Sequence, residues 1–229
     1  MWHETLIIGH RGAPRLAEEN SITSFRLAFE AGADGIELDV RMTRDGMLVV
    51  HHDDDIPTVG RIAAMEWGEL KRGCRVRERA LHTLEDVFKQ LAGHGFFDIE
   101  LKEAGLAPVA LTLARDLLPP NTFAFSSFRA DVIVECRRHA PDEPAFLILE
   151  KRFNHENMLR LLKEIDATGI APHFKLITEP LAMFFGQREV PIYTWTVNHL
   201  KDVQRLVELG VRGIITDVPG DLVKAAANA

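Results

Sequence analysis

The sequence is poor in cysteine and carries no excess of positive charge. Its 229 residues include two cysteines, Cys74 and Cys136, which form no short-spaced motif. This pattern excludes a disulfide-rich secreted scaffold and favours reduced thiols that pack as small apolar groups. The formal net charge is −7 at pH 7. A nucleic-acid-binding protein usually presents a basic face, so we expect no nucleic-acid partner.

Long hydrophobic runs are also missing. No run approaches the ~18 apolar residues that are needed to cross a bilayer. The first residues provide neither the basic nor the apolar segment of a signal peptide. With 46% hydrophobic and 27% charged residues, the composition is that of an ordinary globular protein. We therefore expect one domain over residues 1–229 in the cytoplasm, without stable membrane insertion, and a homo-oligomer is compatible with this composition.

Short apolar runs alternate with amphipathic stretches along almost the whole chain. Ser21 and Thr83 have the residue types that cap helices, and each precedes an apolar-periodic stretch. The expected strands cover 6–9, 35–42, 96–101, 122–126, 145–149, 169–171, 190–197 and 213–216. Eight strands that are each followed by a helix predict an α/β fold, the closed (β/α)₈ or TIM barrel. The alternative is a doubly wound open sheet, but its glycine-rich fingerprint does not follow the first strand.

A β-hairpin is expected to extend the second strand. Asp45-Gly46 lies between two apolar runs, and 47–52 would form the returning arm. A two-residue turn pairs residues whose numbers sum to 91, which would place Asp39 opposite His52, with Cβ atoms roughly 4.5–5.5 Å apart. Glu37 would share the face of Asp39. Residues 54–81 are expected to be an irregular polar loop, a small insertion after the second barrel strand.

Three carboxylates stand near the ends of expected strands: Glu37, Asp39 and Glu100. In a barrel these strand ends meet at one rim. Close carboxylates repel and raise each other's pKa unless a cation joins them. Oxygen ligands suit Mg²⁺ or Ca²⁺, so we expect one divalent cation held by these three residues. A single strand-end acid would more simply be solvated or paired with arginine.

Two histidines and two cations accompany the acids. His10 and His52 follow apolar runs, and imidazoles can act as general acid and base near neutral pH. Arg11 offers a fork for two phosphate oxygens and Lys102 a point charge, so both are candidates for phosphate binding. Trp195 could border the pocket for an apolar or choline-like group, or belong to the core. Together these residues predict a metal-dependent phosphodiesterase site.

The same segments resemble the glycerophosphodiester phosphodiesterase family in their order along nearly the whole chain. The matching motifs are His10-Arg11-Gly12, Glu19-Asn20-Ser21, Gly32-Ala33-Asp34-Gly35-Ile36-Glu37-Leu38-Asp39-Val40, Thr43, Asp45-Gly46, His52-Asp53, Asp98-Ile99-Glu100-Leu101-Lys102, Ser126-Ser127-Phe128, Trp195-Thr196-Val197-Asn198 and Gly210-Val211-Arg212-Gly213-Ile214-Ile215-Thr216-Asp217. The family usually has Pro-Glu-Asn-Thr where Glu19 takes the proline position and Ser21 the threonine position; serine can still cap a helix, so we expect little effect. Ile56-Pro57-Thr58-Val59 does not reproduce an Arg-Thr-Thr segment of many members, and the insertion there is short. These last two departures concern head-group preference and substrate size.

The resemblance implies a TIM barrel with a divalent metal on Glu37, Asp39 and Glu100, and His10 and His52 as general acid and base. It implies that Arg11 and Lys102 hold the phosphate of a small-molecule glycerophosphodiester, such as glycerophosphocholine or glycerophosphoethanolamine. The products would be glycerol 3-phosphate and an alcohol, after attack by the 2-hydroxyl or by water. Alternatives are a lysophospholipase D or a cyclic-phosphate-forming enzyme of the same superfamily, a non-catalytic glycerophosphodiester-binding protein, and a metal-assisted isomerase or aldolase.

Overall fold

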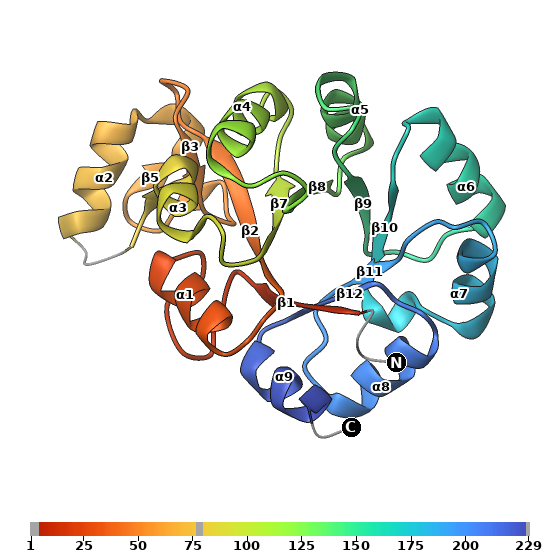
Figure 1. Cartoon of the computed structure of the whole chain (residues 1–229). Coiled ribbons are helices and arrows are strands. Elements are labelled where there is room, and N and C mark those ends of the chain that lie inside the picture. Colours follow the sequence, from red (N-terminus) through yellow and green to blue (C-terminus); the bar gives the residue numbers. More distant parts are fainter. Residues whose placement is uncertain (1–4, 77–79, 228–229) are drawn as a thin grey trace.

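The computed structural model describes residues 5–76 and 80–227, which are organised around a barrel of eight parallel strands (Figure 1). The strands are β1 (Leu6–His10), β2 (Gly35–Met42), β7 (Phe96–Leu101), β8 (Phe123–Ser127), β9 (Ala145–Leu149), β10 (Gly169–Pro172), β11 (Tyr193–Thr194) and β12 (Gly213–Thr216). They pair in the order β10-β9-β8-β7-β2-β1-β12-β11. Isolated bridges from Ile170 to Ile192 and from His173 to Trp195 join the two ends. The barrel is therefore nearly closed, and the TIM-barrel prediction is confirmed.

Helices surround the barrel on its outside, as Figure 1 shows. They are α1 (Ile22–Glu30), α3 (Leu84–Leu91), α4 (Ala107–Leu117), α5 (Ala130–His139), α6 (His155–Glu164), α7 (Glu179–Gly186), α8 (Leu200–Glu208) and α9 (Pro219–Ala227). The predicted caps are confirmed, because Ser21 accepts a hydrogen bond from the Ser24 amide and Thr83 accepts one from the Asp86 amide. Each cap satisfies an amide that the first helical turn leaves unpaired. Among the described residues, no helix combines the length and apolar character required to cross a bilayer.

Apolar side chains pack on both surfaces of the barrel wall. Between strands and helices lies the main core, in which the rings of Phe88 and Phe97 meet edge to face, with centroids 5.5 Å apart. A smaller cluster with Ala124, Phe146 and Ile148 fills part of the barrel interior. The ring of Tyr193 packs against Phe146 there at 4.4 Å. The strands are thus buried on both faces, as expected of parallel strands in an α/β protein.

The predicted hairpin exists, but its predicted register is wrong. β3 (Leu48–Val50) runs antiparallel to β2, and its paired residues have numbers that sum to 90, such as Val40 and Val50. The turn has three residues, 44–46, because Gly46 adopts a left-handed conformation with φ of 83° and the Thr43 amide bonds to the Met47 carbonyl. Asp39 and His52 are therefore not paired across the hairpin. His52 instead follows the end of β3.

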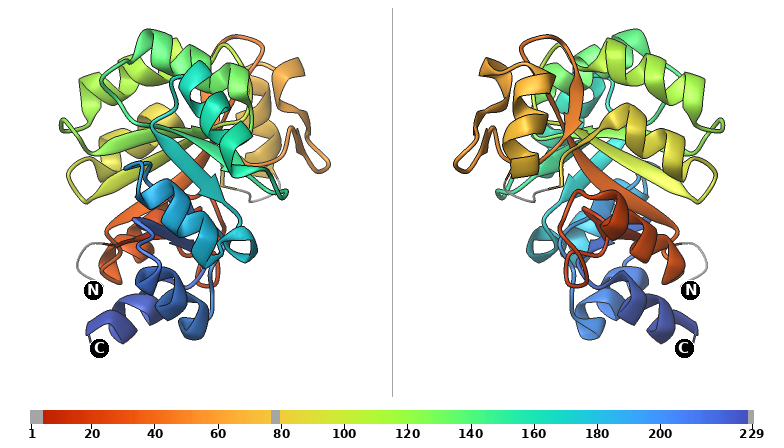
Figure 2. Two further views of the ribbon diagram at one scale, coloured as in Figure 1. Left: turned by 90° about the vertical axis from the view of Figure 1, so that its right-hand side faces the viewer. Right: turned by 90° about the vertical axis from the view of Figure 1, so that its left-hand side faces the viewer.

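The expectation of an irregular loop over 54–81 is also wrong, although residues 77–79 of this segment lie outside the described residues. The described part forms a two-stranded hairpin of β4 (Asp55–Ile56) and β5 (Gly60–Arg61), a 3₁₀ turn (Ile62–Ala64) and α2 (Trp67–Val76). The short β6 (His82–Thr83) then pairs with β3. A small separate core holds this insertion together: Val49, Ile56, Ile62, Leu70 and Cys74. Figure 2 shows the insertion in orange on the outside of the barrel.

The expected strand over 190–197 is much shorter in the structure. Only Tyr193 and Thr194 form β11. Pro191 has no amide hydrogen to contribute to a ladder, although its carbonyl accepts a hydrogen bond from the Ile170 amide at 3.1 Å. The seam between β10 and β11 is accordingly the least regular part of the barrel.

We expect Gly213→Ala to destabilise the barrel. Gly213 pairs with Tyr193, and a Cβ atom at this glycine would lie 1.6 Å from Cδ1 of the tyrosine ring. The ring would have to move within a packed interior, which should lower the free energy of unfolding by about 1–3 kcal/mol. Chemical denaturation measures this difference. Gly186→Ala is the matched control, because nothing lies within 4 Å of its added Cβ. Equal stability of Gly213→Ala and the unsubstituted protein would contradict this account of the packing.

Candidate active site

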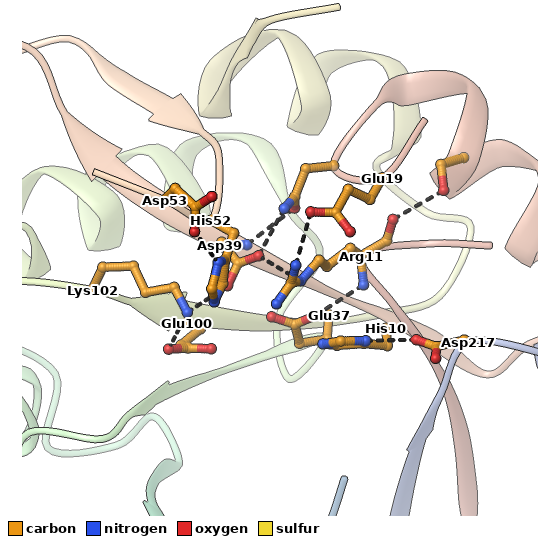
Figure 3. A network of polar contacts seen from close by, with 12 residues as sticks. His10, Arg11, Glu19, Glu37, Asp39, His52, Asp53, Glu100, Lys102 and Asp217 are labelled. Carbon is orange, nitrogen blue, oxygen red and sulfur yellow. Dashed lines mark hydrogen bonds and ion pairs between the residues drawn. The ribbon is translucent and has the colours of Figure 1, made fainter. Parts of the chain in front are cut away.

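The barrel topology brings the three predicted metal ligands together. Glu37 and Asp39 lie on β2, and Asp39 is in register with Glu100 on the neighbouring β7. One carboxylate oxygen from each of the three residues lies within 4.8 Å of the other two, and all three side chains are buried. Oε1 of Glu37 is buried without a hydrogen-bond partner among the described residues. The three carboxylate groups therefore lie close enough together to coordinate one cation (Figure 3).

The three carboxyl groups differ in how readily they ionise. Burial, with Asp39 and Glu100 nearby, raises the pKa of Glu37 well above its usual value. Burial also raises the pKa of Glu100 to about 7, although Lys102 opposes this shift. Burial acts in the same direction on Asp39, but Lys102 and Arg11 outweigh it and lower the pKa of Asp39 to about 2. Asp39 is therefore the permanently charged member of the group.

Lys102 and Arg11 lie within this acidic group. The Lys102 Nζ is 2.7 Å from Oδ1 of Asp39 and 2.5 Å from Oε1 of Glu100. The Arg11 Nε is 3.1 Å from Oδ2 of Asp39, and its Nη1 bonds to Glu19 at 2.8 Å. Burial alone would favour the neutral form of both bases, but the surrounding carboxylates raise the pKa of each. Both side chains thus stay positively charged at the place predicted for a phosphate.

Each predicted catalytic histidine has one ring nitrogen engaged by a carboxylate. His10 Nδ1 lies 2.7 Å from Oδ1 of Asp217, and His52 Nδ1 lies 2.7 Å from Oδ1 of Asp53. Such contacts set the orientation and tautomer of an imidazole. Nε2 is then the nitrogen of each ring that can exchange a proton with a ligand. Half-burial of His52 lowers its pKa. Asp39 opposes this shift, and the nearby Lys102 and Arg11 add to it.

Several residues that support the site were not among the predicted site residues. Asn20 donates a hydrogen bond from Nδ2 to Oδ2 of Asp39 at 2.7 Å and has a positive φ of 56°. Asn198 donates to Oδ2 of Asp217 at 2.8 Å. Asp98 is buried and precedes Glu100 by two residues, so both side chains lie on the same face of β7. Burial raises the pKa of Asp98 to about 6. Polar residues directly beside strand or helix ends are the sequence signal for this supporting group, but each is too common a feature to be assigned alone.

The predicted site residues other than Asp39 border a single cavity of about 70 Å³. Its lining comprises His10, Arg11, Glu37, His52, Asp98, Glu100, Lys102, Ser126, Phe128, Ile148, Ala171, Trp195 and Ile215. Trp195 packs edge to face with Phe128 at 5.5 Å and donates from its indole to the Ala171 carbonyl. A larger hollow is lined by parts of α7 and α8 and by residues near Thr5. None of the predicted site residues lines that hollow, so the chemistry points to the smaller cavity.

The sequence and fold match known proteins closely enough to classify the chain. Residues 10–221 match the model of the glycerophosphoryl diester phosphodiesterase family. A glycerophosphodiester phosphodiesterase of Caldanaerobacter subterraneus is 29% identical, over 96% of this chain and 97% of its own length. The crystal structure of a glycerophosphodiester phosphodiesterase from Thermotoga maritima has a TM-score of 0.85 at 25% identity, over 97% of this chain and 99% of that one. The structure of an Oleispira antarctica phosphodiesterase in complex with the product sn-glycerol-3-phosphate has a TM-score of 0.87 at 21% identity. This match covers 99% of this chain and 98% of that one.

The charge balance of the cavity fits a divalent cation. Four carboxyl groups (Glu37, Asp39, Asp98 and Glu100) face two cationic side chains, so full ionisation leaves two negative charges uncompensated. Burial is the main reason that three of these acids have raised pKa values, and the neighbouring carboxylates add to the shift. Bound Mg²⁺ or Ca²⁺ would offset the excess charge, and the unpartnered Oε1 of Glu37 supplies a ligand atom.

We expect Ca²⁺ or Mg²⁺ to stabilise the protein through Glu37 and Glu100. A ligand at about 100 times its Kd stabilises the folded state by about 2.7 kcal/mol, which raises Tm by roughly 5–10 °C for a chain of this size. Glu37→Gln and Glu100→Gln should remove most of this rise because each variant loses a charged ligand. Glu164→Gln, on the exposed side of α6, is the control. Thermal melts with and without each ion measure the effect, and an unchanged rise in both site variants would contradict the assignment.

Proposed function

Because the chain belongs to the glycerophosphoryl diester phosphodiesterase family, we propose that it hydrolyses glycerophosphodiesters to glycerol 3-phosphate and an alcohol. The observation that carries this proposal is the convergence of three acids, two carboxylate-bound histidines and two buried cations in one cavity (Figure 3). The family relatives named above support an enzyme with this activity. The product bound to the Oleispira phosphodiesterase supports a small-molecule phosphate ester as the ligand.

Glu37, Asp39 and Glu100 would hold the divalent cation, Mg²⁺ or Ca²⁺. When bound, such an ion supplies positive charge that stabilises the negative charge developing on phosphoryl oxygens. Arg11 and Lys102 supply further positive charge from the cavity wall, and both stay protonated because of the carboxylates around them. Their positions orient the phosphate before reaction and stabilise the charge on it during reaction.

His10 and His52 carry the protons. One imidazole accepts a proton at Nε2 from the attacking hydroxyl, either water or the 2-hydroxyl of glycerol. Where the 2-hydroxyl attacks, the first product is a cyclic phosphate, which water then opens to glycerol 3-phosphate. The other donates a proton from Nε2 to the leaving alkoxide, so that the P–O bond to the alcohol breaks without releasing a free alkoxide. Asp217 and Asp53 hold the two rings by Nδ1 and so direct each Nε2 into the cavity. Trp195 and Phe128 border the space for the departing alcohol.

We also propose that residues 1–229 act as one domain in the cytoplasm. The match to the family model spans 10–221 without interruption. The chain has two cysteines and both are buried, and this low cysteine content suits a reducing compartment.

We expect the purified protein to release glycerol 3-phosphate from glycerophosphocholine or glycerophosphoethanolamine, and EDTA to remove this activity. Product analysis by phosphorus NMR separates the related reactions. Accumulation of a cyclic phosphate would favour the cyclic-phosphate-forming alternative, and release of choline from a lysophospholipid would favour lysophospholipase D. Binding without turnover in the presence of either metal would identify a non-catalytic binding protein.

We expect His10→Ala and His52→Ala each to lower kcat by about 10²–10⁴-fold, because each removes one proton-transfer group. Asp217→Asn should cause a smaller loss of roughly 10–100-fold, since it disturbs only the contact that orients the His10 ring. His139→Ala, at the exposed end of α5, is the matched control. Steady-state kinetics on variants with unchanged melting temperature provide the measurement. Full activity in either site histidine variant would refute its catalytic role.

A further inference from the structure

The lining of the cavity floor includes two buried polar side chains with little hydrogen bonding of their own. Oδ1 of Asp98 and Oγ of Ser126 lack a hydrogen-bond partner of good geometry among the described residues, although Ser126 is close enough to lower the pKa of Asp98 in part. The two residues are 7% and 1% exposed, and both line the cavity. Buried polar atoms in folded proteins are almost always hydrogen-bonded, because leaving them unpaired is costly. Two such atoms facing one cavity therefore indicate a polar ligand group.

The strand register places this pair next to the reacting centre. Asp98 on β7 is in register with Glu37, and Ser126 on β8 is in register with Glu100. Asp98 precedes Glu100 by two residues and so faces the same side of the strand, one layer deeper in the barrel. Two residues along a strand correspond to roughly 6–7 Å. Among the described residues, the group of acids within 4.8 Å consists of Glu37, Asp39 and Glu100, so Asp98 lies outside the proposed metal site.

The rest of this floor is apolar. Ile148, Ala171 and Ile215 line the cavity together with the polar pair. A carboxylate oxygen can accept a hydrogen bond, and a serine hydroxyl can both donate and accept one. A ligand group that donates to Asp98 and accepts from Ser126 is a hydroxyl, and the apolar side chains suit the carbon that carries it. The floor therefore has the chemistry to bind a primary alcohol.

We propose that Asp98 and Ser126 form a subsite for the terminal hydroxyl of the glycerol moiety, the one farthest from the phosphate. This inference rests on the proposed function and specifies how its substrate lies in the cavity. The glycerol points into the barrel with its phosphate at the acids above, and the leaving alcohol points toward Phe128, which is 46% exposed.

The subsite has a consequence for substrate choice. A glycerophosphodiester with a free terminal hydroxyl satisfies both buried atoms. A lysophospholipid acylated at that position has no hydroxyl to donate, and its chain would have to enter the closed interior of the barrel. The subsite thus selects deacylated glycerophosphodiesters, while the alcohol at the open mouth is selected weakly.

The test compares glycerophosphocholine with its analogue lacking the terminal hydroxyl, the phosphocholine ester of propane-1,2-diol. A site built to pair a hydroxyl rejects the analogue that lacks it, so we expect kcat/KM to favour glycerophosphocholine by at least about 100-fold. Ser126→Ala and Asp98→Ala should each reduce this preference to roughly 10-fold or less, because one pairing atom is gone. Ser127→Ala is the matched control: Ser127 faces away from the cavity and donates to the Leu101 carbonyl. Its preference should equal that of the unsubstituted protein.

A binding measurement separates this proposal from the proposed function. Calorimetry with glycerol 3-phosphate and propane-1,2-diol 1-phosphate, in the presence of Ca²⁺, should show the same preference and its loss in Ser126→Ala and Asp98→Ala. Absence of turnover together with this binding preference would refute the proposed function and retain the subsite. An unchanged preference in both folded variants would overturn the subsite. Loss of the Ca²⁺-induced rise in Tm in Asp98→Ala would also overturn it, because Asp98 would then act through the metal.

Discussion

The surplus of negative charge at one end of the barrel is the constraint on which the rest of the site depends. Glu37, Asp39 and Glu100 lie side by side because β2 and β7 are adjacent parallel strands. Lys102 and Arg11 compensate Asp39 almost completely, and its pKa of about 2 records this. Burial raises the pKa values of the other two acids, and the neighbouring cations only partly oppose this shift. This excess of negative charge favours the binding of a cation, and a bound cation would in turn favour the binding of a phosphate.

The scaffold holds each charged group by more than one contact. Asn20 bonds to Asp39, the Arg11 amide bonds to Glu37, and both Arg11 and Asn20 have positive φ values. The loop after β1 therefore adopts an unfavourable backbone conformation at two residues, which brings two hydrogen-bond donors to the acids. Asp217 and Asn198 come from the last part of the chain and hold His10 in a hydrogen-bonded chain. Segments about 200 residues apart thus meet at one imidazole, and precise orientation there is what proton transfer requires.

Much of the fold could be predicted from alternating apolar and amphipathic stretches. The bounds of β2, β7 and β12 agree with expectation, because strands buried on both faces leave a continuous apolar run bounded by glycine or polar residues. The insertion before α3 was expected, but its helix was not predicted, since that helix is polar on most of its surface and buries little beyond Leu70 and Cys74. The length of β11 was overestimated, because an apolar run indicates burial but does not show whether the residues around Pro191 form strand hydrogen bonds.

The sequence by itself determined the residue types of the site and the strand ends on which they lie, because side-chain chemistry and hydrophobic period are local properties. Only the tertiary structure decided which of them meet. A turn of three residues instead of two moved His52 off the expected pairing with Asp39, yet the following segment returned it to the cavity. The partners Asp217 for His10 and Asn20 for Asp39, and the place of Asp98 beneath Glu100, follow from barrel closure and strand register. Those are long-range relations, which no local pattern of residues encodes.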